Sequence, residues 1–319
     1  MKRRLAALSA SMLLASPVLA ASVSLPIEAP GPLGPLRGTL LDPGSSIAPV
    51  LIIPGSGPTD RDGNNPLGIR ASSYKLLAEA LAARGLSTVR IDKRGLFGSA
   101  GAVADGNAVT VPDYAADVRS WVATIRKRLG SRCVWLLGHS EGGLVALAAT
   151  GGMPDVCGLL LLSAPGRKAG EILREQLRAN PANAPVLDQA LAAIAALEAG
   201  KRVNTAGMHP ALMSLFAPPV QNYLISLLSY DPAALLAGTD QPVLVIQGRR
   251  DLPVTEVDAR RLAAARAGVQ LRLLDGVNHV LKLVPLDDRN VNFATYADPA
   301  LPIAPELVDA VATFVIERK

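Results

Sequence analysis

The chain has 319 residues, half of them hydrophobic, which is ample for one large buried core. Its 32 basic and 27 acidic residues give a formal net charge of +5, but the first 20 residues hold three of the basic residues and no acidic one. The remaining chain carries 29 basic and 27 acidic residues without a basic stripe, which argues against nucleic acid as a partner. Aromatic residues are 3% of the chain, too few for the stacking platforms that carbohydrate binding uses.

The first 20 residues have the pattern of a secretory signal peptide. A basic start at Lys2, Arg3 and Arg4 precedes an apolar stretch over 5–14, and small residues at 18–20 come before a cleavage site ahead of Ala21. The alternative is a membrane anchor, but serines interrupt the apolar stretch and it is too short to span a bilayer comfortably. We therefore expect an exported protein, periplasmic or secreted, with no stable membrane anchor after cleavage.

Short apolar runs rich in Val, Ile and Leu recur along the chain and are typical of buried parallel strands. They lie at 22–27, 36–41, 50–53, 87–91, 133–137, 159–162, 243–246 and 271–274. Helical patterns fall between them, over 72–84, 114–129, 144–149, 256–267 and 306–316. This alternation predicts an α/β fold, an open and mostly parallel sheet with helices on both faces.

One interval, after the sixth strand, contains no strand pattern. Helical patterns over 173–180, 184–199 and 212–228 are divided there by Pro and Gly. Such an insertion lies above the carboxyl ends of the strands, where ligands bind in open α/β sheets. We expect residues 164–240 to form a helical cap that shapes a substrate pocket, on a core of residues 21–163 and 241–319. The alternative is a helical hairpin that only adds stability.

The sequence Gly138-His139-Ser140-Glu141-Gly142-Gly143 follows a predicted strand and precedes a helix-prone run. A strand, a sharp turn with serine and a helix make up the nucleophile elbow of α/β-hydrolases. Small neighbours are needed because the turn is strained. Ser140 is therefore the candidate nucleophile, at a helix N-terminus that favours a developing oxyanion.

A nucleophilic serine needs a base, and the base needs an orienting carboxylate. Of the three histidines, only His279 follows a late strand; His139 is inside the elbow and His209 lies in the predicted cap. The acid is best assigned to Asp251, which follows the strand at 243–246 and a glycine turn. Its alternative role is capping the next helix, and Asp275 is a rival acid only four residues from His279.

The oxyanion hole needs two backbone N–H groups. One is expected from Glu141, the residue after the nucleophile. The second is expected from the Gly-rich loop over 54–64, where the Ser56 amide is the first choice and Gly57 the second. Charged residues near these strand ends are expected to form ion pairs rather than to catalyse: Asp60, Arg61, Asp62, Asp92, Lys93 and Arg94.

Cys133 and Cys157 are the two cysteines of the chain, and each lies near the start of a predicted strand. Those strands are expected to be neighbours, with both cysteines at the edge opposite the catalytic end. In an exported protein such cysteines either pair as a disulfide or remain two buried thiols, and the sequence leaves both open.

The chain resembles secreted bacterial α/β-hydrolases of the serine aminopeptidase-like group, which contains many esterases. The matching segments are 54–64, 92–95 with Gly98 and Ser99, 138–143, 248–254, 278–282, 296–299 and 301–302. The resemblance covers nearly the whole mature chain except the cap. It implies the α/β-hydrolase fold with an eight-stranded, mostly parallel sheet and a catalytic triad at Ser140, Asp251 and His279.

We therefore expect a serine hydrolase that cleaves small-molecule carboxylic esters through an acyl-enzyme intermediate, without a metal or organic cofactor. The same triad also serves an amidase, a serine aminopeptidase or an acyltransferase. An aminopeptidase needs a carboxylate to hold the substrate amine, for which Glu171, Glu175 and Asp231 are candidates. A non-catalytic binding protein on this scaffold is a remote alternative, and the sequence leaves the oligomeric state unknown.

Overall fold

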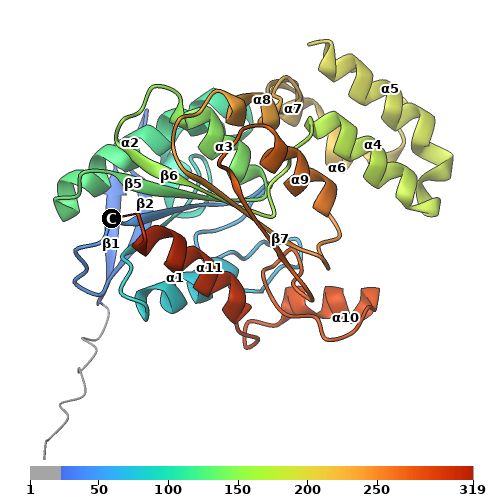
Figure 1. The fold of residues 1–319 in the computed structure, drawn as a ribbon. Helices are drawn as coiled ribbons and strands as arrows, with labels where there is room; N and C mark the ends of the chain where they lie inside the picture. The colour runs from blue at the N-terminus through green and yellow to red at the C-terminus, as the bar shows by residue number, and fades with distance from the viewer. Residues whose placement is uncertain (1–22, 319) are drawn as a thin grey trace, which may run out of the picture.

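The computed structural model describes residues 23–318, so the expected signal peptide lies outside the described residues. Eight strands form one sheet (Figure 1). They are β1 (Val23–Ala29), β2 (Leu36–Asp42), β3 (Val50–Ile53), β4 (Thr88–Ile91), β5 (Val134–His139), β6 (Val156–Leu162), β7 (Val243–Gly248) and β8 (Gln270–Leu274). Each of the eight apolar runs that predicted a strand overlaps one of them.

The order across the sheet is β1-β2-β4-β3-β5-β6-β7-β8. β1 and β2 form an antiparallel pair, β2 is antiparallel to β4, and every pairing from β4 to β8 is parallel. The expected α/β-hydrolase fold is confirmed. Because β3 and β5 to β8 run in the same direction, the loops that follow them meet at one edge of the sheet.

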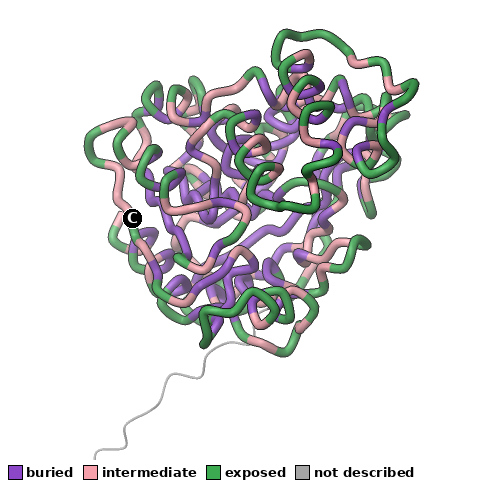
Figure 2. The backbone as a smooth tube through the Cα atoms, turned by 90° about the vertical axis from the view of Figure 1, so that its right-hand side faces the viewer, coloured by how far each residue is buried: buried purple, intermediate pink, exposed green. Residues whose placement is uncertain are grey.

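Strand residues alternate between two hydrophobic cores, one on each face of the sheet. In β3, Leu51 and Ile53 belong to one core, and Val50 and Ile52 to the other. Helices α2 (Val111–Leu129), α3 (Glu141–Thr150), α8 (Pro232–Ala237) and α9 (Glu256–Ala264) cover the first face, and α1 (Ser73–Ala82) and α11 (Pro305–Ile316) the second. This double burial explains the continuous apolar runs, and Figure 2 shows the buried strands within a more exposed shell.

Between β6 and β7 the chain is helical, as α4 (Ala169–Ala179), α5 (Leu187–Glu198), α6 (Pro210–Phe216) and α7 (Gln221–Leu228), which we call the cap, and then α8. The cap has a hydrophobic core of its own, in which Phe216 is fully buried. The prediction of one helix over 212–228 was wrong. Pro218 and Pro219 divide it into α6 and α7, because proline lacks the N–H that would continue the ladder.

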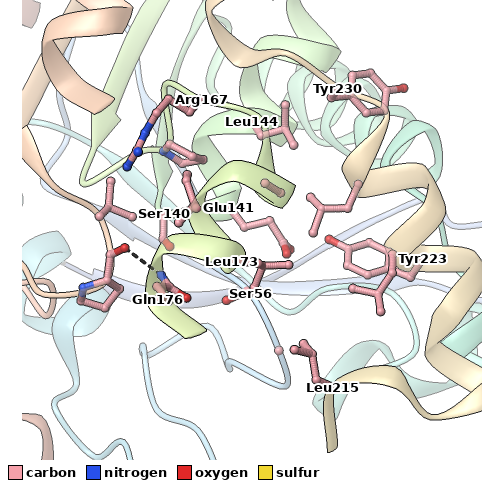
Figure 3. A pocket seen from close by; sticks show the side chains of 18 of the residues that line it. Ser56, Ser140, Glu141, Leu144, Arg167, Leu173, Gln176, Leu215, Tyr223 and Tyr230 are labelled. Carbon is pink, nitrogen blue, oxygen red and sulfur yellow. Dashed lines mark hydrogen bonds between the residues drawn. The ribbon is translucent and has the colours of Figure 1, made fainter. Parts of the chain in front are cut away.

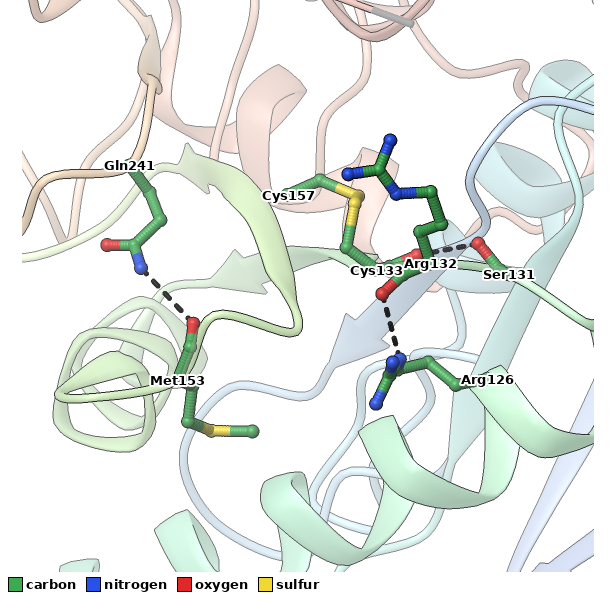
Figure 4. The surroundings of a disulfide bond; sticks show 7 residues. All are labelled: Arg126, Ser131, Arg132, Cys133, Met153, Cys157 and Gln241. Carbon is green, nitrogen blue, oxygen red and sulfur yellow. Dashed lines mark hydrogen bonds between the residues drawn. A yellow bond between two sulfur atoms is a disulfide. The ribbon is translucent and has the colours of Figure 1, made fainter.

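Cys133 and Cys157 form a disulfide, with their Cα atoms 5.2 Å apart (Figure 4). Cys133 lies directly before β5 and Cys157 is the second residue of β6. The bond therefore joins two neighbouring parallel strands at their amino ends. The nucleophile elbow follows the carboxyl end of β5, so the disulfide and the elbow lie at opposite ends of this strand.

Removing this disulfide is expected to lower the free energy of unfolding by about 3 kcal/mol, because the bond closes a loop of about 25 residues in the unfolded chain. Urea unfolding of the Cys133→Ser/Cys157→Ser double variant, beside the oxidised wild type, measures the loss. Activity of the folded double variant at 25 °C should match that of the wild type, since the site lies at the other end of the strands. An unchanged unfolding midpoint would contradict the prediction.

Candidate active site

Ser140 occupies the turn between β5 and α3 with φ 53° and ψ −127°, a conformation that L-residues rarely adopt. Its backbone N–H donates to the Leu162 carbonyl at 3.0 Å, which ties the turn to the end of β6. Such a backbone costs about 1–3 kcal/mol and persists only where the surrounding structure imposes it. The strain is the structural counterpart of the sharp turn that the sequence predicts.

The glycines of the elbow are required by close backbone contacts. A Cβ atom at Gly138 would lie 2.3 Å from the Gly142 carbonyl oxygen, and one at Gly142 would lie 2.3 Å from the Ile53 carbonyl oxygen. Neither backbone neighbour can yield as a flexible side chain would. A larger residue at Gly142 would therefore push the elbow away from β3, and one at Gly138 would push α3 away from β5.

His279 and Asp251 meet at the carboxyl edge of the sheet, 28 residues apart in sequence. The imidazole Nδ1 lies 2.9 and 3.0 Å from the two carboxylate oxygens of Asp251. The Asp251 carboxylate is fully buried and also accepts the Val254 N–H at 2.9 Å. Because an ionised carboxylate only accepts, Nδ1 carries the proton and the lone pair of Nε2 remains for another partner.

The rival residues lie elsewhere. Asp275 is exposed and pairs with Arg249 at 2.8 Å. His209 is in the cap, where its Nδ1 accepts the Ala211 N–H at the start of α6. Helix α9 begins after Thr255, so Asp251 is not its N-cap residue.

Ser140 and His279 both line one cavity of about 470 Å³, between the carboxyl edge of the sheet and the cap (Figure 3). Within residues 23–318 no hydrogen bond joins the two side chains. In ligand-free sites such bonds are commonly long and tighten when substrate binds. The structure thus places the predicted nucleophile and the predicted base on the wall of the same cavity, with the predicted acid behind the base.

The two predicted oxyanion residues line the same cavity. Glu141 is the first residue of α3, so its N–H has no acceptor within the helix. Within the described residues the Ser56 N–H also donates to no protein group, and Gly57 lies beside it on the cavity wall. Two free amides near Ser140 are what a developing oxyanion requires.

A buried chain of hydrogen bonds connects the oxyanion loop to the His279 loop. The Gly55 N–H donates to the Tyr74 hydroxyl at 3.0 Å, and that hydroxyl lies 2.8 Å from His139 Nδ1. His139 Nε2 lies 2.8 Å from the His279 carbonyl oxygen. A carbonyl only accepts, so His139 carries its proton on Nε2, and Tyr74 donates to Nδ1. Tyr74 and His139 therefore hold the loops on either side of Ser140.

The buried His139 in this chain of hydrogen bonds makes the stability of the protein sensitive to acid. Burial and the nearby His279 lower the pKa of His139 from 6.5 to about 3. As the pH falls, the unfolded chain therefore binds a proton at this histidine at a much higher pH than the folded protein does. The stability that neutral His139 contributes is complete above pH 6.5 and falls as the pH drops toward 3. Between pH 7 and pH 4.5 the loss from this group should be about 2–3 kcal/mol.

Urea unfolding of the wild type and of His139→Gln at both pH values tests this expectation. The variant should be less stable at pH 7 but should lose about 2–3 kcal/mol less between the two pH values, because the other titrating groups are common to both proteins. Equal losses in the two proteins would show that His139 does not carry the acid sensitivity.

The charged residues around the elbow form ion pairs, with one exception. The predicted ion pair of Asp60 was wrong: among the described residues its carboxylate pairs with no basic side chain and instead accepts the N–H groups of Asp62 and Asn64, at 2.9 and 2.8 Å. Arg61 donates from its backbone N–H and from Nε to Asp92, at 2.9 and 3.0 Å. Arg94 donates to the buried carboxylate of Asp117 at 2.7 Å. Lys93 is buried too, and its ammonium donates to the Gly55 carbonyl at 2.7 Å and lies 3.8 Å from the Glu141 carboxylate. These contacts fix the loops after β3 and β4.

A second connection, at α10 (Arg289–Ala294), was not predicted. Asn292 donates to the Arg250 carbonyl at 2.7 Å, and its own amide oxygen accepts from the buried Asn278 side chain at 3.0 Å. Asn292 therefore ties the residue before Asp251 to the residue before His279. Neither Asn292 nor Tyr74 lies in a motif, and only conservation among homologues could have identified them from sequence.

Apolar side chains make up most of the cavity wall. The cap and the residues after it supply Ile172, Leu173, Leu215, Val220, Leu224, Leu227 and Tyr230, and the core supplies Leu144, Pro165, Pro253 and Val254. Arg167, also on the wall, is held at 2.8 Å by the buried Asp258 of α9. A cavity of this size and character suits a small, mainly apolar molecule.

Comparisons with known proteins agree with this geometry. Residues 50–295 match the family model described as the alpha/beta hydrolase family. The chain is 25% identical over 245 residues to Esterase EstD of Thermotoga maritima, covering 73% of this chain and 54% of the relative. It therefore spans about half the length of that curated relative.

Solved structures share the fold. The esterase Pf2001 of Pyrococcus furiosus matches with a TM-score of 0.59 at 18% identity, over 95% of this chain and 93% of the other. A bromoperoxidase of Bacillus anthracis matches with a TM-score of 0.55 at 16% identity, over 92% and 100%. Similarity at this level shows the fold and leaves the activity to the site. The family match covers more than half of the chain, and the protein belongs to the alpha/beta hydrolase family.

Proposed function

We propose that this protein is an exported serine hydrolase that cleaves carboxylic esters of small molecules. The observation that carries the proposal is the meeting of Ser140, His279 and two unengaged backbone amides on one cavity wall, with Asp251 hydrogen-bonded behind His279. These are the parts that acyl transfer needs: a nucleophile, an oriented base and an oxyanion site.

In the proposed reaction, His279 Nε2 takes the proton of the Ser140 hydroxyl as its oxygen attacks the ester carbonyl. The amides of Ser56 and Glu141 stabilise the oxyanion, and the Asp251 carboxylate stabilises the imidazolium that forms. His279 then protonates the leaving alcohol. Water, activated by the same imidazole, releases the acid and restores Ser140.

Ester hydrolysis is preferred over aminopeptidase activity because none of the three expected amine-binding acids lines the cavity. Glu175 pairs with Arg167 on the surface of α4. Asp231 accepts the N–H groups of Ala233 and Ala234 at the start of α8. Glu171 lies exposed in the first turn of α4. The similarity to a relative named as an esterase supports the same choice.

Export belongs to the same proposal. The expected signal peptide and the disulfide between Cys133 and Cys157 both suit an oxidising compartment such as the periplasm. Fractionation of cells that express the full chain, with N-terminal sequencing of the mature protein, tests it.

Two assays on the purified mature protein test the activity. A fluorophosphonate probe should label the wild type at Ser140, because the probe reacts with serines activated by a base. The p-nitrophenyl esters of graded chain length should then be hydrolysed with a kcat/KM at least about 100-fold above that of aminoacyl p-nitroanilides. Labelling with a reversed ratio would favour the peptidase, and absence of labelling would favour a binding protein.

A further inference from the structure

A buried lysine lies behind the two residues that are expected to form the oxyanion hole. Lys93 is the second residue after β4 and is only 7% exposed, and lysine is rarely buried to this extent unless its ammonium is paired. Among the described residues Ser56 and Glu141 line the substrate cavity, whereas Lys93 does not. Lys93 therefore approaches these two residues from the interior of the protein, on the side away from the substrate.

The first contact of Lys93 is with the peptide group that carries the Ser56 N–H. Its Nζ donates to the Gly55 carbonyl at 2.7 Å, and this carbonyl and the Ser56 N–H belong to the same peptide group. Within residues 23–318 no peptide bond is cis, so the carbonyl and the N–H point in opposite directions. Because Lys93 holds the carbonyl on the interior side, the N–H is directed toward the cavity that Ser56 lines.

The same hydrogen bond makes the Ser56 amide a stronger donor. A cationic donor draws electron density toward the carbonyl oxygen, which increases the positive charge on the N–H of that peptide group. On the other side of Gly55, its own N–H donates to the Tyr74 hydroxyl at 3.0 Å. Both peptide groups that flank Gly55 are therefore held in place by side chains from other parts of the chain.

The second contact of Lys93 is with the other oxyanion residue. Its Nζ lies 3.8 Å from the Glu141 carboxylate, which is buried as well. Burial lowers the pKa of Lys93, while the Glu141 carboxylate opposes this shift and favours the charged form. The ring of Tyr114, with its centroid 5.4 Å from Nζ, also favours a cation at this position. The ammonium thus contacts both residues whose amides are expected to bind the oxyanion.

We propose that Lys93 is a positioning residue of the oxyanion hole, which orients and polarises the Ser56 amide through the Gly55 carbonyl and holds Glu141 through its carboxylate. The aligned amides act on the negative charge that develops on the substrate carbonyl oxygen. The ester carries this charge only in the transition state, so the contribution of Lys93 should appear in kcat rather than in KM. This inference rests on the proposed ester hydrolysis.

Lys93→Met nearly keeps the length of the side chain but removes the donor. With p-nitrophenyl butyrate, kcat should fall by about 10- to 100-fold and KM should change by less than about threefold, because a hydrogen bond to a charged group contributes an effect of this size. Lys75→Met removes an exposed lysine of α1 as the matched control, and both constants should stay within about twofold of the wild type. Circular dichroism and thermal unfolding establish that each variant is folded.

Two ketones distinguish an oriented oxyanion hole from a general loosening of the site. The Ser140 oxygen bonds to the carbonyl carbon of 1,1,1-trifluoro-2-octanone, the carbonyl oxygen becomes an anion, and the serine proton passes to His279. The compound 2-octanone has the same chain and binds as a neutral ketone. Lys93→Met should raise the inhibition constant of the trifluoroketone by about 10- to 100-fold, as it lowers kcat, and that of 2-octanone by less than about threefold.

A double variant separates positioning from charge balance. Lys93→Met leaves the buried Glu141 carboxylate without its cation, which can by itself destabilise the protein. Lys93→Met/Glu141→Met removes both charges but still leaves the Gly55 carbonyl without the ammonium. Its kcat should be at least about tenfold below that of Glu141→Met alone. If Lys93→Met does not fold, the double variant serves for the comparison of the two ketones, again relative to Glu141→Met.

The outcomes separate this inference from the proposed function. The role of Lys93 is overturned if Lys93→Met retains the wild-type kcat, if it weakens the binding of both ketones equally, or if the double variant reaches the kcat of Glu141→Met. Ester hydrolysis stands in each of these cases. Failure of the wild type to hydrolyse the p-nitrophenyl esters overturns the proposed function itself and the role of Lys93 with it.

Discussion

Ser140→Ala should lower kcat/KM for ester hydrolysis by at least about 10³-fold and abolish labelling by the fluorophosphonate probe. The variant removes the only atom that bonds covalently to the acyl group. The cavity, the two amides and the His279–Asp251 pair remain, so ester binding should survive and only turnover should be lost.

The variant should fold like the wild type, because alanine takes the same backbone position and the Ser140 hydroxyl makes no hydrogen bond within residues 23–318. Ser229→Ala, which removes an exposed hydroxyl of the cap region, serves as the matched control and should retain full activity. Ester hydrolysis by Ser140→Ala at the wild-type rate would rule out the proposed mechanism.

Asp251→Asn should reduce kcat/KM by about 10³- to 10⁴-fold, with little change in fold. The carboxylate accepts the Nδ1–H of His279, with 2.9 Å between Nδ1 and Oδ2. It also compensates the positive charge that the imidazole gains in the transition state. An asparagine carboxamide keeps the size of the side chain, and its oxygen can still accept the Val254 N–H. It can also donate to Nδ1, which would leave His279 in the tautomer that cannot act as a base.

Asp275→Asn provides the control for this substitution. Asp275 is the rival acid near His279 in sequence, but its carboxylate is exposed and paired with Arg249. We expect unchanged kcat and KM for this variant, measured with the same ester. If Asp275→Asn lost activity and Asp251→Asn retained it, the assignment of the acid would be reversed.

The two variants also separate local sequence proximity from spatial proximity. Asp275 and His279 are four residues apart, whereas Asp251 and His279 are 28 residues apart. The strands β7 and β8 are parallel neighbours, so the loops after their carboxyl ends meet. The positions of the strands in the sheet therefore predict the pairing of Asp251 with His279 better than the number of residues between an aspartate and His279 does.

Much of the fold could be predicted because each buried parallel strand is a continuous apolar run between helical patterns, and both signals are local. The short helices α8 and α10 were not predicted, since six residues carry too little periodicity. The division of the long cap helix could have been predicted from Pro218 and Pro219, but the apolar pattern on both sides outweighed the proline signal.

Sequence by itself determined the strained serine turn, because its neighbouring glycines and the flanking strand and helix are local features of the chain. It also indicated which aspartate and histidine follow the late strands. Only the tertiary structure decided the pairing of Cys133 with Cys157 and the hydrogen-bond chain from Gly55 through Tyr74 and His139 to the His279 loop. These contacts join segments far apart in sequence, and their geometry depends on how the helices and the cap pack on the sheet.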